Sequence, residues 1–136
     1  MMSILKIDDQ NEIYYEFIEP KDNGHTFVFV NALTGSTAAW NGVIGDRITE
    51  DGNGFLAYNF RGQDNSKFSE ELNLDTDLIV SDLCLLIEKL KLKNIILVGL
   101  SIGGLYASLA LEKGVKSNGL VLINTLRKNN TRLKWI

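Results

Sequence analysis

The sequence has little or nothing of several features on which particular classes of protein depend. Its single cysteine, Cys84, cannot form an internal disulfide, which favours a reducing compartment and makes the cytoplasm the expected location. No apolar run is long enough to span a bilayer, and residues 1–9 lack the layout of a signal peptide. The net charge of -3 provides no basic surface for nucleic acid. Metal-ligand spacings, a P-loop and a dinucleotide fingerprint are also missing, so no metal and no other cofactor is expected.

What the sequence does contain is a regular alternation of short apolar runs and helix-like segments. Two runs, 3–7 and 12–19, flank a polar turn and predict a β-hairpin that ends at Pro20. Continuous apolar runs predict buried strands at 27–30, 55–58, 95–98 and 120–123. Helices are expected at about 36–48, from Asp75 or Thr76 to about Leu90, and at 102–113. This order predicts an α/β fold in one domain, with an N-terminal hairpin and a mainly parallel sheet that carries helices on both faces.

The segment 99–104, with the sequence GLSIGG, lies between a predicted strand and a predicted helix. A serine on so tight a turn is held above the sheet, and small residues two positions to either side, Gly99 and Gly103, avoid a clash. The N–H of Ile102 then begins the helix and points to where an acyl oxyanion would form. We therefore expect Ser101 to be a nucleophile. The alternative is a strand-to-helix turn in which the glycines only allow close packing.

The loop after the first buried strand, residues 31–36, is the second candidate element. In this architecture it must offer another backbone N–H to the same oxyanion. Leu33 is the expected donor, facing Ile102. Asn31 and Thr34 could order the loop through side-chain hydrogen bonds. The alternative is an Asx or threonine turn that only caps the following helix.

The third segment, residues 59–66 with the sequence NFRGQDNS, follows the next buried strand. Gly62 suits a turn there. Arg61 is expected to pair with a carboxylate or with backbone carbonyls, as part of the scaffold and not of the chemistry. Trp40, on the predicted helix at 36–48, is expected to pack in the core or in a pocket wall.

In their order and spacing these three segments resemble the α/β-hydrolase family. Residues 99–104 look like its nucleophile elbow, with Ser101 in the nucleophile position. Residues 59–66 resemble its aspartate-x-arginine-glycine-x-glycine-x-serine segment, in which Asn59 replaces the aspartate and Asp64 replaces the second glycine. The resemblance implies an incomplete α/β-hydrolase fold and a serine esterase or amidase that acts on a small acyl substrate.

The oxyanion loop departs most from the family pattern. The family usually has His-Gly before the donor, whereas this chain has Asn31-Ala32. Residues 32–35 are instead similar to the loop of the homoserine O-acetyltransferase branch, which has the same fold and serine chemistry. Three functions therefore stay open: hydrolysis through an acyl-enzyme on Ser101, acyl transfer to an alcohol, and a non-catalytic binding domain or remnant on the same fold.

The resemblance also implies a histidine and an acid that follow the strand ending at Ile123, where some members carry the acid and this chain has Asn124. The sole histidine, His25, precedes the first buried strand, roughly 13 Å from the active end at about 3.3 Å per residue, so it cannot be the base. We therefore expect 1–136 to be the N-terminal portion of one α/β-hydrolase domain. Alone it would be inactive, with an apolar sheet edge exposed and a lid helix beginning within 126–136.

Overall fold

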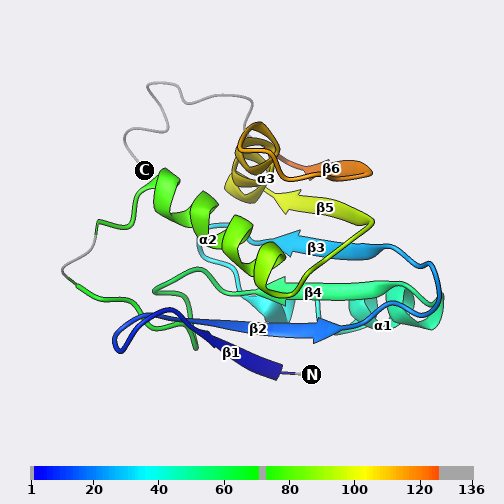
Figure 1. The fold of residues 1–136 in the computed structure, drawn as a ribbon, viewed down its shortest axis with the longest axis horizontal. Coiled ribbons are helices and arrows are strands. Elements are labelled where there is room, and N and C mark those ends of the chain that lie inside the picture. Colours follow the sequence, from blue (N-terminus) through cyan, green and yellow to red (C-terminus); the bar gives the residue numbers. More distant parts are fainter. Residues whose placement is uncertain (1, 71–72, 126–136) are drawn as a thin grey trace.

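The computed structural model describes residues 2–70 and 73–125, and the expected lid helix within 126–136 lies outside them. Figure 1 shows one sheet with helices on both faces. The strands are β1 (Met2–Lys6), β2 (Glu12–Ile18), β3 (Thr26–Val30), β4 (Gly54–Tyr58), β5 (Ile95–Leu100) and β6 (Gly119–Ile123). The helices are the 3-10 helix η1 (Thr37–Ala39), α1 (Val43–Glu50), α2 (Thr76–Lys89) and α3 (Ile102–Glu112). The predicted α/β class and the predicted order of strands are confirmed.

The sheet is mainly parallel, in the spatial order β1-β2-β4-β3-β5-β6. The strands β1 and β2 form an antiparallel hairpin, and β2 also pairs antiparallel with β4. The pairs β4–β3, β3–β5 and β5–β6 are parallel. Val30, the last residue of β3, lies opposite Gly99 of β5. The carboxyl ends of β3, β4 and β5 therefore meet at one end of the sheet, and the loops that leave them hold all three candidate segments.

Each face of the sheet has its own apolar core, because both faces of the central strands carry large side chains. On the face covered by α2 and α3, the core joins those helices to β3, β4 and β5 (Figure 1). On the opposite face, next to α1, the buried members are Phe29, Trp40, Phe55, Ala57 and Val98. The Trp40 ring stacks on Phe29 with 4.7 Å between ring centroids. The expectation that Trp40 packs in the core is confirmed.

The prediction of a single helix at about 36–48 is wrong, because the chain forms η1 and α1 with a break at residues 40–42 between them. Ser36 caps η1 by accepting a hydrogen bond from the Ala38 N–H at 3.3 Å. The Trp40 indole is fixed in the core by its Nε1–H donating to Asn31 Oδ1 at 2.7 Å, and Gly42, a poor helix former, follows two residues later. The buried indole thus sets the direction of the chain before α1 begins.

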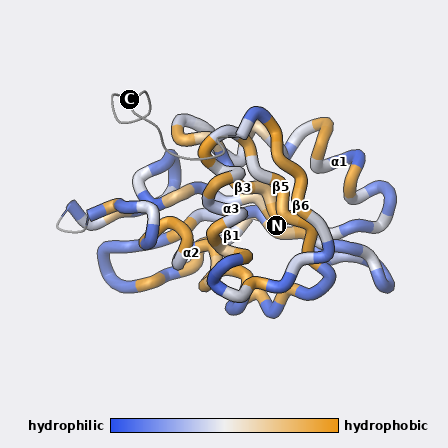
Figure 2. Tube along the Cα trace, turned by 90° about the horizontal axis from the view of Figure 1, so that it is seen from above, coloured by the Kyte–Doolittle hydropathy of each residue, from blue (hydrophilic) through white to orange (hydrophobic). Residues whose placement is uncertain are grey.

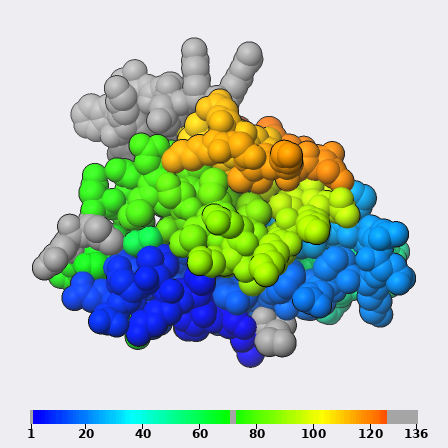
Figure 3. Space-filling view, in the orientation of Figure 1, coloured from blue at the N-terminus to red at the C-terminus, as the bar shows by residue number. Residues whose placement is uncertain are grey.

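β6 is the edge strand of the sheet, and its apolar side chains are largely uncovered. The exposed fractions are 37% for Leu120, 44% for Val121, 49% for Leu122 and 38% for Ile123. Successive residues of a strand point to opposite faces, so both faces of β6 are open. The tube of β6 is largely in the hydrophobic colour of Figure 2, and Figure 3 shows the strand, in orange, on the molecular surface. The expected exposed apolar edge is confirmed.

Within the described residues no helix is both long enough and apolar enough to cross a membrane.

Candidate active site

Ser101 occupies a strained turn between β5 and α3. Its backbone has φ 55° and ψ −123°, a combination that residues other than glycine rarely adopt and that costs on the order of 1–3 kcal/mol. Two contacts from the end of β6 hold it there. The Ser101 N–H donates to the Ile123 carbonyl at 2.9 Å, and the Thr125 hydroxyl donates to the Ser101 carbonyl at 3.0 Å.

The glycines around Ser101 are required by close backbone contacts. A Cβ at Gly99 would meet the backbone of Gly104 in the first turn of α3, and a Cβ at Gly103 would meet the carbonyl oxygens of Val30 and Asn31. The spacing argument for Gly99 and Gly103 thus has a steric basis in this structure. Gly103 also brings α3 directly against the end of β3, where the loop 31–36 begins.

Replacing Ser101 with glycine is expected to raise the free energy of unfolding by about 1 kcal/mol. Relief of roughly 1–3 kcal/mol of backbone strain exceeds the roughly 0.5–1 kcal/mol that a glycine adds to the entropy of the unfolded chain. Ser108→Gly, within α3, is the control and should lose about 1 kcal/mol of stability. Urea denaturation measures both. Equal losses in the two variants would mean that position 101 stores no strain.

The backbone N–H of Ile102 lies at the amino end of α3. Within the described residues, no side chain caps this helix end and no hydrogen bond uses the Ile102 N–H. Unpaired N–H groups and the helix dipole make such an end a favourable place for a negative charge. The turn therefore offers a hydroxyl and an adjacent hydrogen-bond donor in one short segment.

The loop 31–36 forms a tight turn in which the Gly35 N–H donates to the Ala32 carbonyl at 3.0 Å. Leu33 lies at the tip as a residue that is 55% exposed, and its N–H makes no hydrogen bond to another described residue. Asn31 orders the base of the loop, because its Nδ2 donates to the Tyr58 carbonyl at 2.7 Å. The side chain of Thr34 makes no such bond to the described residues, contrary to what we expected.

A residue that the sequence analysis missed, Gln63, holds the tip of this loop. Its Nε2 donates to the carbonyls of Ala32 at 3.1 Å and Leu33 at 2.8 Å. Its Oε1 accepts from the Phe60 N–H at 2.8 Å and from Asn31 Nδ2 at 3.3 Å. The contact depends on the parallel pairing of β3 with β4, which brings the loops after the two strands together, and no signal in the local sequence reveals it.

The same two loops line an open surface pocket of about 320 Å³. Its lining residues are Leu33, Thr34, Gly35, Ser36, Gly62, Gln63 and Asp64. Asn59, buried at the base of the second loop, accepts from the Thr37 N–H at 2.9 Å through its Oδ1 and so links that loop to η1.

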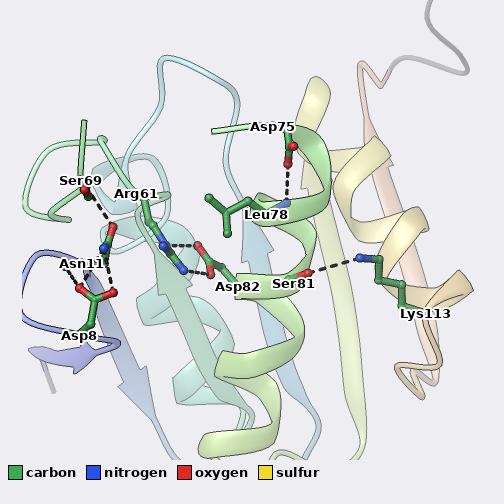
Figure 4. A network of polar contacts seen from close by, with 9 residues as sticks. All are labelled: Asp8, Asn11, Arg61, Ser69, Asp75, Leu78, Ser81, Asp82 and Lys113. Carbon is green, nitrogen blue, oxygen red and sulfur yellow. Dashed lines mark hydrogen bonds and ion pairs between the residues drawn. The ribbon is translucent and has the colours of Figure 1, made fainter. Parts of the chain in front are cut away.

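Arg61 pairs with a carboxylate, as expected, and its partner is Asp82 of α2. The Nε and Nη2 groups of Arg61 donate to the two carboxylate oxygens, each at 2.7 Å (Figure 4). Both side chains are 6% exposed. Burial raises the pKa of the Asp82 carboxyl above its ordinary value, and the Arg61 hydrogen bonds oppose that rise. The pair fixes the loop 59–66 to α2, which is a scaffold role.

Two further side chains are poor candidates for the chemistry. His25 immediately precedes β3, and its carbonyl accepts from the N–H of Gly54, the first residue of β4, at 2.7 Å. It thus lies at the amino ends of the strands, opposite Ser101, and cannot act as the base. Burial raises the pKa of the Cys84 thiol, so this group is protonated near neutral pH and is a weak nucleophile.

The family model described as the alpha/beta hydrolase fold matches residues 25–136. The chain therefore belongs to the α/β-hydrolase family, which the fold and the serine turn had indicated. No curated protein matches the sequence.

Several solved structures match most of the chain. An α/β hydrolase enzyme from a Medee basin deep-sea metagenome library is 25% identical with a TM-score of 0.84, over 97% of this chain and 47% of that one. An esterase from Exiguobacterium antarcticum is 26% identical, with a TM-score of 0.79 over 92% of this chain and 46% of that one. Bromoperoxidase from Bacillus anthracis is also 26% identical, with a TM-score of 0.81 over 96% of this chain and 48% of that one. The chain thus spans about half the length of these structures.

Proposed function

We propose that the chain supplies the nucleophile and the oxyanion donors of a serine hydrolase that cleaves a small ester or amide. The backbone of Ser101, at φ 55° and ψ −123° between β5 and α3, is the observation that carries this proposal. Strained backbone persists only where the surroundings hold it, and it clusters at active sites. The similarity to an esterase favours ester hydrolysis as the reaction class.

In the proposed reaction the Ser101 Oγ attacks the acyl carbon while a histidine takes its proton and an acid orients that histidine. The bond to the leaving group then breaks, the leaving group takes the proton, and water hydrolyses the acyl-enzyme. The N–H groups of Leu33 and Ile102 hold the oxyanion. Loss of one such donor typically costs about 3 kcal/mol of transition-state stabilisation.

We place the histidine and the acid outside residues 1–136, in a later part of the same domain. His25 is at the wrong end of the sheet, and the similar structures are about twice as long as this chain. Without a base, turnover falls by on the order of 10⁴- to 10⁶-fold, so residues 1–136 alone would be inactive. The coding sequence after codon 136 tests this placement. A histidine codon in a late loop supports it, and an immediate stop codon contradicts it.

A fluorophosphonate probe tests the nucleophile directly in the complete polypeptide. The probe should label Ser101, as mapped by peptide mass spectrometry, and Ser101→Ala should lose the label entirely because the attacking hydroxyl is removed. Ser108→Ala, two turns along α3, should label normally. Equal labelling of Ser101→Ala and the unchanged protein would refute the nucleophile. Absence of labelling in every version would favour a non-catalytic remnant on the same fold.

Acyl transfer is the second candidate, and the loop at 32–35 favours it. That segment is similar to the loop of the homoserine O-acetyltransferase branch, and here it forms the tight turn closed by the Gly35 N–H. In acyl transfer an alcohol, and not water, takes the acyl group from Ser101. Product analysis with acetyl-CoA and an acceptor alcohol separates the two reactions, because a transferase yields an O-acetyl ester where a hydrolase yields free acetate.

A further inference from the structure

We infer that Gln63 is a positioning residue that aims the Leu33 N–H at the oxyanion. This inference rests on the proposed function, because it assigns a role to a side chain that touches the donor loop and not the substrate. Among the described residues, Gln63 is the side chain that donates hydrogen bonds to the carbonyls of both Ala32 and Leu33. Its amide therefore fixes the peptide on each side of Leu33.

The orientation of the donor follows from the geometry of the peptide group. In a planar trans peptide, the carbonyl of one residue and the N–H of the next point in opposite directions. The Ala32 carbonyl accepts from Gln63 Nε2 at 3.1 Å and from the Gly35 N–H at 3.0 Å. Because that carbonyl faces Gln63, the N–H of Leu33 points away from Gln63, and it has no partner among the described residues.

The amide of Gln63 is itself held in one orientation. Its oxygen faces two donors, the Phe60 N–H at 2.8 Å and Asn31 Nδ2 at 3.3 Å. A rotated amide would place its NH₂ against those donors and its oxygen against two carbonyls. Asn31 is fixed in turn, because it donates to the Tyr58 carbonyl and accepts from the Trp40 indole. The chain of contacts runs from the buried core of β4 to the tip of the loop.

A positioning role and a purely structural role differ in which quantity they change. The hydrogen bonds of a part-exposed amide contribute modestly to folding, whereas a displacement of about 1 Å in a catalytic group can slow a reaction by roughly 100-fold. Gln63 should therefore influence turnover far more than the melting temperature. A side chain that only tied down the loop would change stability and leave the rate constant intact.

The test uses the complete polypeptide with Gln63→Glu, Gln63→Met and the control Asn65→Asp. Glutamate keeps the shape of glutamine but cannot donate to the two carbonyls, and it brings a negative charge to them. Both Gln63 variants should lower kcat by about 10- to 100-fold, below the 10²- to 10³-fold typical of deleting a donor, with KM changed less than about twofold. Their affinity for a boronic acid that mimics the tetrahedral intermediate should fall by the same factor. Asn65→Asp adds a charge to the same exposed loop and should leave kcat unchanged.

The inference is wrong if both variants keep kcat within about twofold, or if KM rises while kcat stays constant. It is also wrong if activity is lost only together with folding, as circular dichroism at the assay temperature would reveal. If Gln63→Met does not fold, Gln63→Glu still tests the inference, because glutamate has nearly the same side-chain volume as glutamine. Retained activity in Ser101→Ala would instead refute the proposed function, so the two failures give different results.

Discussion

Replacing Asp82 with leucine is expected to lower the free energy of unfolding by about 3–5 kcal/mol. Arg61 would then keep its charge with 6% of its side chain exposed and no carboxylate to accept its two 2.7 Å hydrogen bonds. A guanidinium cannot lose its proton in a protein, so the cost of the unpaired charge cannot be avoided by neutralisation. Urea denaturation followed by circular dichroism measures the loss.

Removing both charges of this pair should be far less harmful than removing one. The double variant Arg61→Met with Asp82→Leu replaces a buried ion pair by apolar side chains of similar volume, a change that is often neutral or stabilising. Asp77→Leu is the matched control on the same helix, because Asp77 is 91% exposed and lies 4.0 Å from its cation, Lys113. That control should cost less than about 1 kcal/mol. A double variant as unstable as Asp82→Leu alone would mean that the pair stabilises the fold by itself.

Replacing Gly103 with alanine is expected to destabilise the protein by about 1–2 kcal/mol. A Cβ at this position runs into the carbonyl oxygens of Val30 and Asn31, which are backbone atoms and cannot rotate away. Overpacking of this kind typically costs about 1–3 kcal/mol, which outweighs the gain of up to roughly 1 kcal/mol from the better helix former. The first turn of α3 would have to retreat from β3 and carry the Ile102 N–H with it, so activity should fall as well.

Gly119→Ala is the matched control for that substitution. A Cβ at Gly119, the first residue of β6, meets only side-chain atoms of Ile96, at 3.8 and 3.9 Å, which is ordinary van der Waals contact. The control should leave the free energy of unfolding unchanged or raise it by up to about 1 kcal/mol. Similar stabilities of Gly119→Ala and Gly103→Ala would contradict the close approach of α3 to β3.

The features that the sequence predicted well are those encoded in short stretches. Continuous apolar runs predicted the central strands, and the sequence at 99–104 predicted a tight strand-to-helix turn, because both depend on neighbouring residues. The break between η1 and α1 was missed, since it depends on where the Trp40 indole packs. The partner of Arg61 was missed because Asp82 lies 21 positions away. Its place on the apolar face of α2, between Ile79 and Leu86, could have revealed it.

The candidate site was only partly predictable for the same reason. Ser101 and its glycines belong to one local pattern, whereas the loop 31–36 is shaped by Gln63, which lies in the loop after another strand. Gln63 is 31 positions from Ala32, and nothing in the local sequence of either loop requires their contact. The pairing of β3 with β4 creates that contact, so it became visible only with the sheet in place.

The contacts that hold Ser101 also impose an order on biosynthesis. A ribosome makes Ser101 before it makes Ile123 and Thr125, the two residues whose oxygens bond the peptide groups on either side of Ser101. A nascent chain that stops before β6 lacks both of these hydrogen bonds. The full set of contacts at this turn is therefore completed late, after most of the sheet has already emerged.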